Sequence, residues 1–218
     1  MNIICDEVTR FINGFYRAES AQLFALRNSC EAERIPIILR ETESMLGFII
    51  RAARPARLLE IGTAAGYSAA FFASLGVQVT TIEKSPQKAQ AAQENIEALG
   101  LSARVRILIG DGEEAIKNEL SAEEKFEMLF IDAAKSHYQR FLSAALSHLG
   151  PQALIAADNV LLKGTIADAT LDPGGRFKTN IKKMRQYLSF VSDDPRFDTV
   201  IVSCGDGLAL SRYIDGQG

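Results

Sequence analysis

The chain has 218 residues, of which 47% are hydrophobic and 23% are charged. This balance is enough for a packed core and argues against bulk disorder. The formal net charge of −3 excludes a globally basic coat for nucleic acid, although it is compatible with a local basic patch. No apolar run approaches the roughly 18 residues that a membrane span needs, and the first residues lack the pattern of a secretory signal. We therefore expect a cytoplasmic protein.

The three cysteines, Cys5, Cys30 and Cys204, are far apart and form no Cys-x-x-Cys pair. Their odd number and wide spacing argue against a disulfide framework or a zinc cluster, and in favour of a reducing compartment. We expect them to be partly buried thiols.

Residues 6–53 have a helical pattern, which Pro36 interrupts. Apolar residues recur there at helical spacing, and they are Leu23, Leu26, Ile37, Ile38, Met45, Leu46, Ile49 and Ile50. We expect one domain over residues 1–218, in which a helical cap (1–55) precedes an α/β core (56–218).

From Arg57 onward, short apolar segments alternate with helical patterns. The expected strands are 57–62, 78–83, 104–109, 126–131 and 152–157, and the expected helices are 66–75, 86–99, 112–119, 136–149 and 177–192. Ser85 followed by Pro86 is a typical helix start. Segments 197–203 and 207–213 flank Gly205-Asp206-Gly207, which predicts a hairpin and an antiparallel last strand. The alternation predicts a mostly parallel sheet, with ligands at the carboxyl ends of the strands.

The first expected strand ends in a glycine-containing turn, Gly62 to Gly66, before a helix. Such a turn lets the backbone approach a ligand closely, although it is also compatible with a purely structural turn. Ala64 stands where a dinucleotide-binding fingerprint has its second glycine. The turn therefore weakens the alternative of an NAD-dependent oxidoreductase.

Two further acidic residues end the next expected strands. Glu83 follows Gly62 by roughly 20 residues, a spacing at which an acidic side chain accepts hydrogen bonds from ribose hydroxyls. Asp111-Gly112 ends the third expected strand, where the pair can meet an adenine edge. Together with Gly62, these positions favour a nucleoside site.

Oxygen-bearing side chains follow the fourth and fifth expected strands. Asp132 ends one, and Asp158 and Asn159 end the other. Two carboxylates and an amide oxygen suit Mg²⁺; a helix cap and a turn are the structural alternative. Lys135, one helical turn after Asp132, is placed to take a proton or to steady an oxyanion.

Four motifs resemble the cation-dependent class I O-methyltransferases, a family that includes catechol and caffeoyl-coenzyme A O-methyltransferases. They are E-I-G-T-x-x-G-Y-S (60–68), F-I-D-A-A-K-x-x-Y (130–138), A-D-N-V (157–160) and G-D-G-L (205–208). The resemblance implies a Rossmann-like fold with a seven-stranded sheet, and S-adenosylmethionine as cofactor. It also implies cofactor contacts at Ile38, Glu60, Gly62, Thr63, Gly66, Tyr67, Ser68, Glu83, Lys84, Asp111, Gly112 and Asp132.

Within that resemblance, Glu83 would hold the ribose, Asp111 and Gly112 the adenine end, and Gly62 and Ser68 the methionine portion. Ile38 would lie in a segment that closes over the cofactor. A further set of residues would hold Mg²⁺, and these are Asp132, Asp158 and Asn159. Lys135 matches the family's catalytic lysine. The resemblance implies a substrate with two neighbouring oxygens, and a homodimer packed through the N-terminal helices and the last hairpin.

Within the family, the chain most resembles bacterial tRNA 5-hydroxyuridine methyltransferases, in the segments I-D-A-A-K (131–135), D-N-V-L-x-K-G (158–164) and G-D-G-L-A (205–209). The base 5-hydroxyuracil has its C5 hydroxyl beside the C4 carbonyl. The segment 176–187 carries five basic side chains, and Lys163 follows the metal motif, so both are candidates for a tRNA backbone surface. A solvated helix face is the alternative for that segment. Ala133 and Ala134 predict an open floor that suits a flipped base. A small catechol is the rival substrate, and a non-catalytic binding module has little support.

Overall fold

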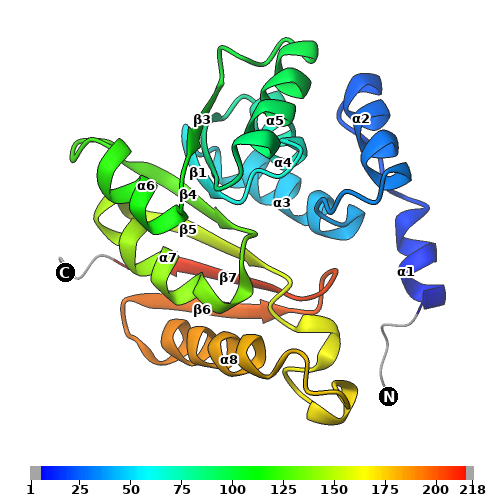
Figure 1. Ribbon diagram of the computed structural model, residues 1–218, viewed down its shortest axis with the longest axis vertical. Helices are drawn as coiled ribbons and strands as arrows, with labels where there is room; N and C mark the ends of the chain where they lie inside the picture. The colour runs from blue at the N-terminus through cyan, green and yellow to red at the C-terminus, as the bar shows by residue number, and fades with distance from the viewer. Residues whose placement is uncertain (1–5, 215–218) are drawn as a thin grey trace.

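The computed structural model describes residues 6–214, so Cys5 lies outside the described residues. Within these residues, seven strands form one sheet in the order β3-β2-β1-β4-β5-β7-β6 (Figure 1). The strands are β1 (Arg57–Ile61), β2 (Gln78–Glu83), β3 (Val105–Ile109), β4 (Phe126–Ile131), β5 (Leu149–Asp158), β6 (Phe197–Val202) and β7 (Leu208–Tyr213).

The pairing of the strands confirms the expected direction of each. β1 runs parallel to β2 and β4, β2 is parallel to β3, and β4 is parallel to β5. β7 is antiparallel to both β5 and β6. Gly205 and Gly207 have φ angles of +56° and +85° in the turn of this last hairpin, a conformation that favours glycine. The sheet is therefore mostly parallel with an antiparallel last strand, as predicted.

Eight α-helices of the described chain precede or connect the strands. They are α1 (Asp6–Asn13), α2 (Ala21–Ala32), α3 (Arg40–Ala53), α4 (Tyr67–Ser74), α5 (Pro86–Ala98), α6 (Gly112–Glu119), α7 (Tyr138–Ala145) and α8 (Lys178–Asp193). Short 3₁₀ turns lie at Lys135–His137, Leu146–His148, Leu162–Gly164 and Ala169–Leu171. Ser85 caps α5 by accepting a hydrogen bond from the amide of Lys88, and Pro86 occupies the first turn, which confirms that helix start. No helix between residues 6 and 214 is long and apolar enough to cross a membrane.

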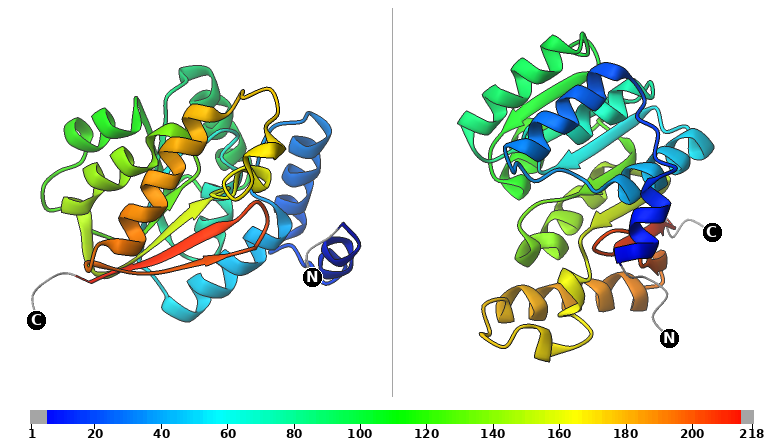
Figure 2. Two further views of the ribbon diagram at one scale, coloured as in Figure 1. Left: turned by 90° about the horizontal axis from the view of Figure 1, so that it is seen from below. Right: turned by 90° about the vertical axis from the view of Figure 1, so that its right-hand side faces the viewer.

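Each face of the sheet packs against its own layer of helices, because successive side chains of a strand point to opposite faces. Leu59 and Leu129 belong to a core that also contains residues of α6, α7 and α8. Their neighbours Leu58 and Met128 belong to a second core with residues of α2, α3, α4 and α5. In the left view of Figure 2, α8 and α3 lie on opposite sides of β7. The central strands β1 and β4 are almost entirely buried, which is why their sequences are mostly apolar on both faces.

The largest departure from the sequence prediction lies between α7 and β5. The predicted helix 136–149 ends at Ala145 as an α-helix, and β5 begins at Leu149 rather than at residue 152. Phe126 pairs with Leu149, whereas Met128 pairs with Leu154, so β5 contains a bulge. Gly150 and Pro151 explain why the sequence pattern places this strand start too late, since neither residue is typical of a strand interior. The predicted N-terminal helical stretch is likewise three helices, with breaks at 14–20 and 33–39.

Candidate functional site

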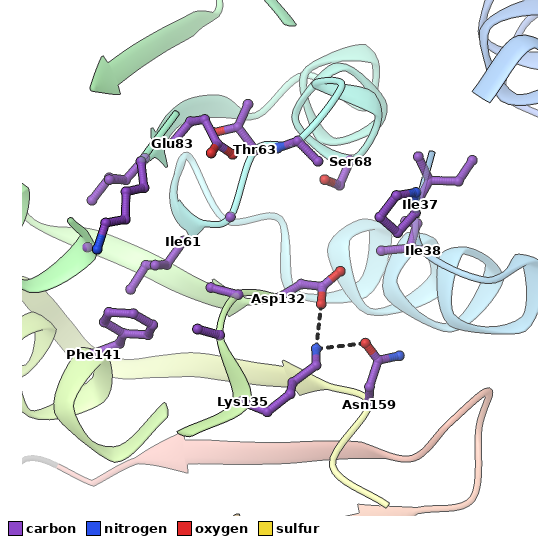
Figure 3. A pocket seen from close by; sticks show the side chains of 18 of the residues that line it. Ile37, Ile38, Ile61, Thr63, Ser68, Glu83, Asp132, Lys135, Phe141 and Asn159 are labelled. Atoms are coloured by element: carbon purple, nitrogen blue, oxygen red, sulfur yellow. Dashed lines mark hydrogen bonds and ion pairs between the residues drawn. The ribbon is translucent and has the colours of Figure 1, made fainter. Parts of the chain in front are cut away.

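A cavity of about 890 Å³ opens at the carboxyl ends of the parallel strands (Figure 3). Its walls come from the turns after β1 to β5, from the segment 36–39 before α3, and from the hairpin between β6 and β7. Most of the residues predicted to bind cofactor, metal or substrate line it, and they are Ile38, Gly62, Thr63, Tyr67, Ser68, Glu83, Lys84, Asp111, Gly112, Asp132, Lys135, Asn159 and Lys163. Glu60, Gly66 and Asp158 do not line it.

The turn after β1 depends on glycine at position 62. Gly62 has a φ of +107°, and a Cβ atom there would overlap the carbonyl oxygen of Asp132. Its amide donates to the carbonyl of Ile82 at 3.0 Å, while the amide of Asp132 donates to the carbonyl of Ile61 at 3.0 Å. A side chain at position 62 would therefore push the end of β1 away from the end of β4.

Glu83 is a buried carboxylate held by two backbone amides. Its Oε2 accepts from the amide of Ala64 at 2.9 Å, and its Oε1 accepts from the amide of Ser85 at 2.9 Å. These bonds fix the carboxylate next to the glycine turn and leave lone pairs for further donors. A rigid acceptor at this place suits a diol such as ribose.

Asp111 caps α6 and lies between two cations. Its carboxylate accepts from Lys84 at 3.3 Å and from Arg140 at 3.0 Å. Although its partial burial opposes the shift, the hydrogen bonds from Lys84 and from the amide of Glu113 lower the pKa of Asp111. A carboxylate that stays ionised at this rim is available to accept from a base or an amide.

Lys135 contacts the oxygen-bearing side chains at the ends of β4 and β5. Its Nζ donates to Oδ1 of Asp132 and to Oδ1 of Asn159, each at 2.7 Å, as the dashed lines of Figure 3 show. It also donates to the hydroxyl of Tyr138 at 2.7 Å, and that hydroxyl donates to the backbone carbonyl of Asp158 at 2.9 Å. The chain thus brings the oxygen side chains of both strand ends around one positive charge.

The carboxylate of Asp158 provides the structural test for a cation at this place. The residue is 1% exposed, its Oδ1 accepts from the amide of Asn159 at 2.8 Å, and its Oδ2 has no hydrogen-bond partner within the described chain. Burial, together with the charge of Asp132, raises the pKa of Asp158 to about 7. No cluster of three or more His, Cys, Asp or Glu side chains forms a metal site between residues 6 and 214. Two carboxylates and an amide with one orphaned oxygen nevertheless fit a hard divalent cation that completes its shell with water or substrate.

Glu60 lies beneath the glycine turn with no exposed surface. Its Oε2 accepts from the hydroxyl of Thr81 at 2.6 Å, and the hydroxyls of Thr81 and Thr63 are 2.6 Å apart. Burial raises the pKa of Glu60 to about 8. The residue supports the turn from below, and its predicted contact with a cofactor stays a prediction.

Two buried charged residues beside the cavity were not among the residues singled out from the sequence. Arg27 of α2 and Glu43 of α3 are 1% and 2% exposed and form an ion pair. The sequence contains one sign that Arg27 is buried. Arg27 follows Leu23 by one helical turn and precedes Cys30, so it falls on the apolar face of α2. Cys30 is buried and Cys204 is partly buried.

The sequence model of the O-methyltransferase family matches residues 19–214. The chain belongs to the O-methyltransferase family. Among curated relatives, the O-methyltransferase imqG of Aspergillus flavus is 31% identical over 66% of this chain and 60% of its own length, so the chain spans less than two thirds of that relative. A catechol O-methyltransferase of Niastella koreensis is 31% identical over 77% of this chain and 78% of its own.

Solved structures of methyltransferases share the fold of this chain. A Staphylococcus aureus protein described as a candidate caffeoyl-CoA O-methyltransferase has a TM-score of 0.89 and 30% identity, and the alignment covers 95% of this chain and 100% of that one. The methyltransferase PaMTH1 of Podospora anserina, solved with S-adenosylhomocysteine, shares the fold at a TM-score of 0.85 and 23% identity, over 99% and 100% of the two chains. The predicted fold and enzyme class, a S-adenosylmethionine-dependent O-methyltransferase, are confirmed. The family match favours this class over an NAD-dependent oxidoreductase and over a non-catalytic binding module.

Proposed function

We propose that this O-methyltransferase requires a divalent cation, Mg²⁺ in the first instance, and methylates a hydroxyl that has a second oxygen beside it. The observation that carries the proposal is the orphaned, buried Oδ2 of Asp158 beside Asp132 and Asn159. These three residues would hold the cation, which when bound would lower the pKa of a chelated substrate hydroxyl. S-adenosylmethionine supplies an activated methyl group.

The residues of the chain then have distinct roles. Lys135 faces the same oxygens as the proposed cation. Its neutral amine is therefore placed to accept the hydroxyl proton, or its ammonium to balance the oxyanion charge. Glu83 would accept from the ribose of the cofactor, Asp111 would face its adenine, and Ile38 would cover it. Gly62 and Ser68 would contact its methionine portion.

For the acceptor, we propose 5-hydroxyuridine in the anticodon loop of a tRNA. Lys163 lies exposed on the cavity rim. Lys183 lines a neighbouring cavity of about 420 Å³ together with Ser136, the residue after Lys135. Five exposed basic side chains lie just before α8 and along its first half, and they are Arg176, Lys178, Lys182, Lys183 and Arg185. A basic surface beside an open cavity suits a phosphate backbone whose base enters the site.

A small catechol is the second candidate, because the Niastella koreensis relative is named as a catechol O-methyltransferase. In addition, Arg185 donates both of its hydrogen bonds to the carbonyl of Ile166, at 3.0 and 2.5 Å. Arg185 therefore has a structural role in the fold that does not require a bound tRNA.

Nucleoside mass spectrometry tests both acceptors. The protein is incubated with 5-hydroxyuridine-bearing tRNA, S-adenosylmethionine and Mg²⁺, and in parallel with EDTA or with a catechol in place of tRNA. We expect 5-methoxyuridine that disappears with EDTA and with Asp158→Asn, whereas the exposed Asp193→Asn control retains it. Methylation of the catechol alone would assign the small-molecule activity, and transfer that persists in EDTA would overturn the cation requirement.

We also propose that the chain forms a homodimer through its N-terminal helices and last hairpin. α1 buries none of its residues within the chain, and Phe11, Phe15 and Phe48 are 70%, 67% and 71% exposed. Val200 and Ile201, on the edge strand β6, are also exposed. Sedimentation at micromolar concentration should show a dimer, and a monomer would contradict the proposal. The cytoplasmic location stays a prediction.

A further inference from the structure

A buried cluster on the N-terminal helices lies beside the cofactor half of the cavity. The guanidinium of Arg27 donates from Nε to the hydroxyl oxygen of Tyr67 at 3.1 Å and from Nη2 to the carbonyl of Ile38 at 3.0 Å. Nη2 also donates to the carboxylate of Glu43, and Nη1 donates to Glu31 at 3.1 Å. Arginine is rarely this deeply buried unless its donors are paired, and here every nitrogen of the guanidinium has a partner.

Glu43, in the first turn of α3, joins the remaining groups of the cluster. Its Oε2 accepts from the hydroxyl of Tyr67 at 2.7 Å as well as from Arg27, and its Oε1 accepts from the hydroxyl of Tyr16 at 2.6 Å. Burial and the charge of Glu43 raise the pKa of Tyr67, so its hydroxyl stays protonated and donates to the carboxylate. The ring of Tyr67 also lies 4.6 Å from the guanidinium carbon of Arg27, within cation–π distance.

Two of the groups that Arg27 holds belong to different walls of the cavity. Tyr67 begins α4 directly after the glycine turn. Ile38 belongs to the segment 36–39, all four residues of which line the cavity. This segment has no helix or strand structure of its own, so its position depends on tertiary contacts. In Figure 3, Ile37 and Ile38 face the cavity from the side opposite Glu83.

We propose that Arg27 and Glu43 are positioning residues for the methyl donor, because their ion pair ties the segment 36–39 to the first turn of α4 and so holds two cavity walls at a fixed separation. When the walls of a cavity are already in place, fewer groups have to become ordered on binding, so the entropic cost of binding is lower. Neither residue lines the cavity, so both act through Ile38 and Tyr67. The inference rests on the proposed function, since it takes S-adenosylmethionine to occupy this half of the cavity.

The variant Arg27→Lys tests this role. Lysine keeps the positive charge, but one ammonium group cannot bond Tyr67, Ile38 and Glu43 with the planar geometry of a guanidinium. We expect the Kd of S-adenosylhomocysteine, measured by calorimetry, to rise about tenfold. The KM for S-adenosylmethionine should rise in parallel, while kcat at saturating cofactor stays within about twofold. Hydrogen exchange of residues 33–40 should become faster in the ligand-free protein.

Two further variants keep the test decisive. Arg104→Lys is the matched control, because Arg104 donates to the carbonyl of Gly76 at 3.0 Å near the amino ends of β2 and β3, and its Kd should equal that of the wild type. Tyr16→Phe removes one donor to Glu43 from a residue outside the cavity, and should raise the Kd about threefold. If Arg27→Lys fails to fold, the Kd of Tyr16→Phe tests the positioning role by itself.

The outcomes separate this inference from the proposed function. If the wild type does not bind S-adenosylhomocysteine, the proposed placement of the cofactor in this cavity fails. If the wild type binds it, and folded Arg27→Lys and Tyr16→Phe bind it equally tightly, the positioning role is overturned. A fall in kcat with an unchanged Kd would also overturn it, because the cluster would then act on the reaction and not on the cofactor.

Discussion

Lys135 and Asn159 follow two different strands, yet the Nζ of the lysine lies 2.7 Å from the Oδ1 of the asparagine. The parallel pairing of β4 with β5 brings these two strand ends together. The same ammonium lies 2.7 Å from Oδ1 of Asp132. Lys135 is therefore a neighbour of the proposed cation ligands and of any hydroxyl that lies among them.

Removing this ammonium should affect the reaction and spare cofactor binding. We expect Lys135→Met to lower kcat by at least about 100-fold, the range of a general acid–base group. The Kd of S-adenosylhomocysteine should stay within about threefold. Lys125→Met is the control, because Lys125 is exposed and donates to the carbonyl of Ser147 away from the cavity. A variant that keeps more than a third of wild-type kcat would remove Lys135 from the reaction.

Gly62 and Gly100 both have a positive φ. A comparison of their alanine variants therefore distinguishes the cost of backbone strain from the cost of steric overlap. Gly62→Ala would place a Cβ atom on the carbonyl oxygen of Asp132, whereas Gly100, with a φ of +70°, has no atom within 4 Å of such a Cβ. We expect Gly100→Ala to cost about 1 kcal/mol of unfolding free energy. Gly62→Ala should cost more than about 3 kcal/mol and should also weaken cofactor binding. Urea unfolding measures the difference, and equal losses would show that the overlap relaxes freely.

Glu60 should make the stability of the protein fall as the pH rises. Burial raises its pKa from 4.5 to about 8 in the folded chain, so the folded state holds a proton that the unfolded state releases between these values. The contribution of Glu60 to the free energy of unfolding should therefore decrease from pH 4.5 to pH 8, by at most about 5 kcal/mol, and level off above. The raised pKa of Asp158 adds to the fall at the lower end of this window. Glu60→Gln should flatten this slope in urea titrations with EDTA, and the exposed Glu114→Gln should not. An unchanged slope in Glu60→Gln would assign the proton to another group.

The basic start of α8 should contribute to tRNA binding through charge alone. We expect Lys182→Gln and Lys183→Gln each to weaken tRNA binding and to reduce the slope of log K against log salt concentration by roughly one. Lys125→Gln, away from this surface, serves as the control. Filter binding over a salt series measures the slope. Wild-type slopes in both variants would mean that this helix face is only solvated.

Local pattern was sufficient to place most of the strands and the oxygen-bearing side chains at their ends. A parallel strand buried on both faces is a short apolar run that ends in a polar residue, and such ends locate Glu83, Asp132 and Asp158. Once the strands are parallel, their carboxyl ends meet at one edge. The Gly-Pro at the start of β5 breaks this pattern, which is why that boundary was misplaced.

The Arg27–Glu43 pair illustrates what a local pattern does not contain. The charged face of a helix is normally its solvated face, and a pairing between two helices depends on how they pack. Arg27 on the apolar face of α2 signals a buried charge, but its partners lie on α3, α4 and the segment 36–39. Only the tertiary structure shows that the cluster adjoins the cavity.

Asn159 adopts a φ of +56° at the end of β5. This backbone angle limits the residue types that position 159 can accept. Among residues with a side chain, asparagine and aspartate enter this region most readily. A random library at position 159 that is selected for activity should therefore return aspartate in preference to glutamine. Aspartate keeps an oxygen for the proposed cation and also tolerates this backbone angle, whereas glutamine keeps only the amide.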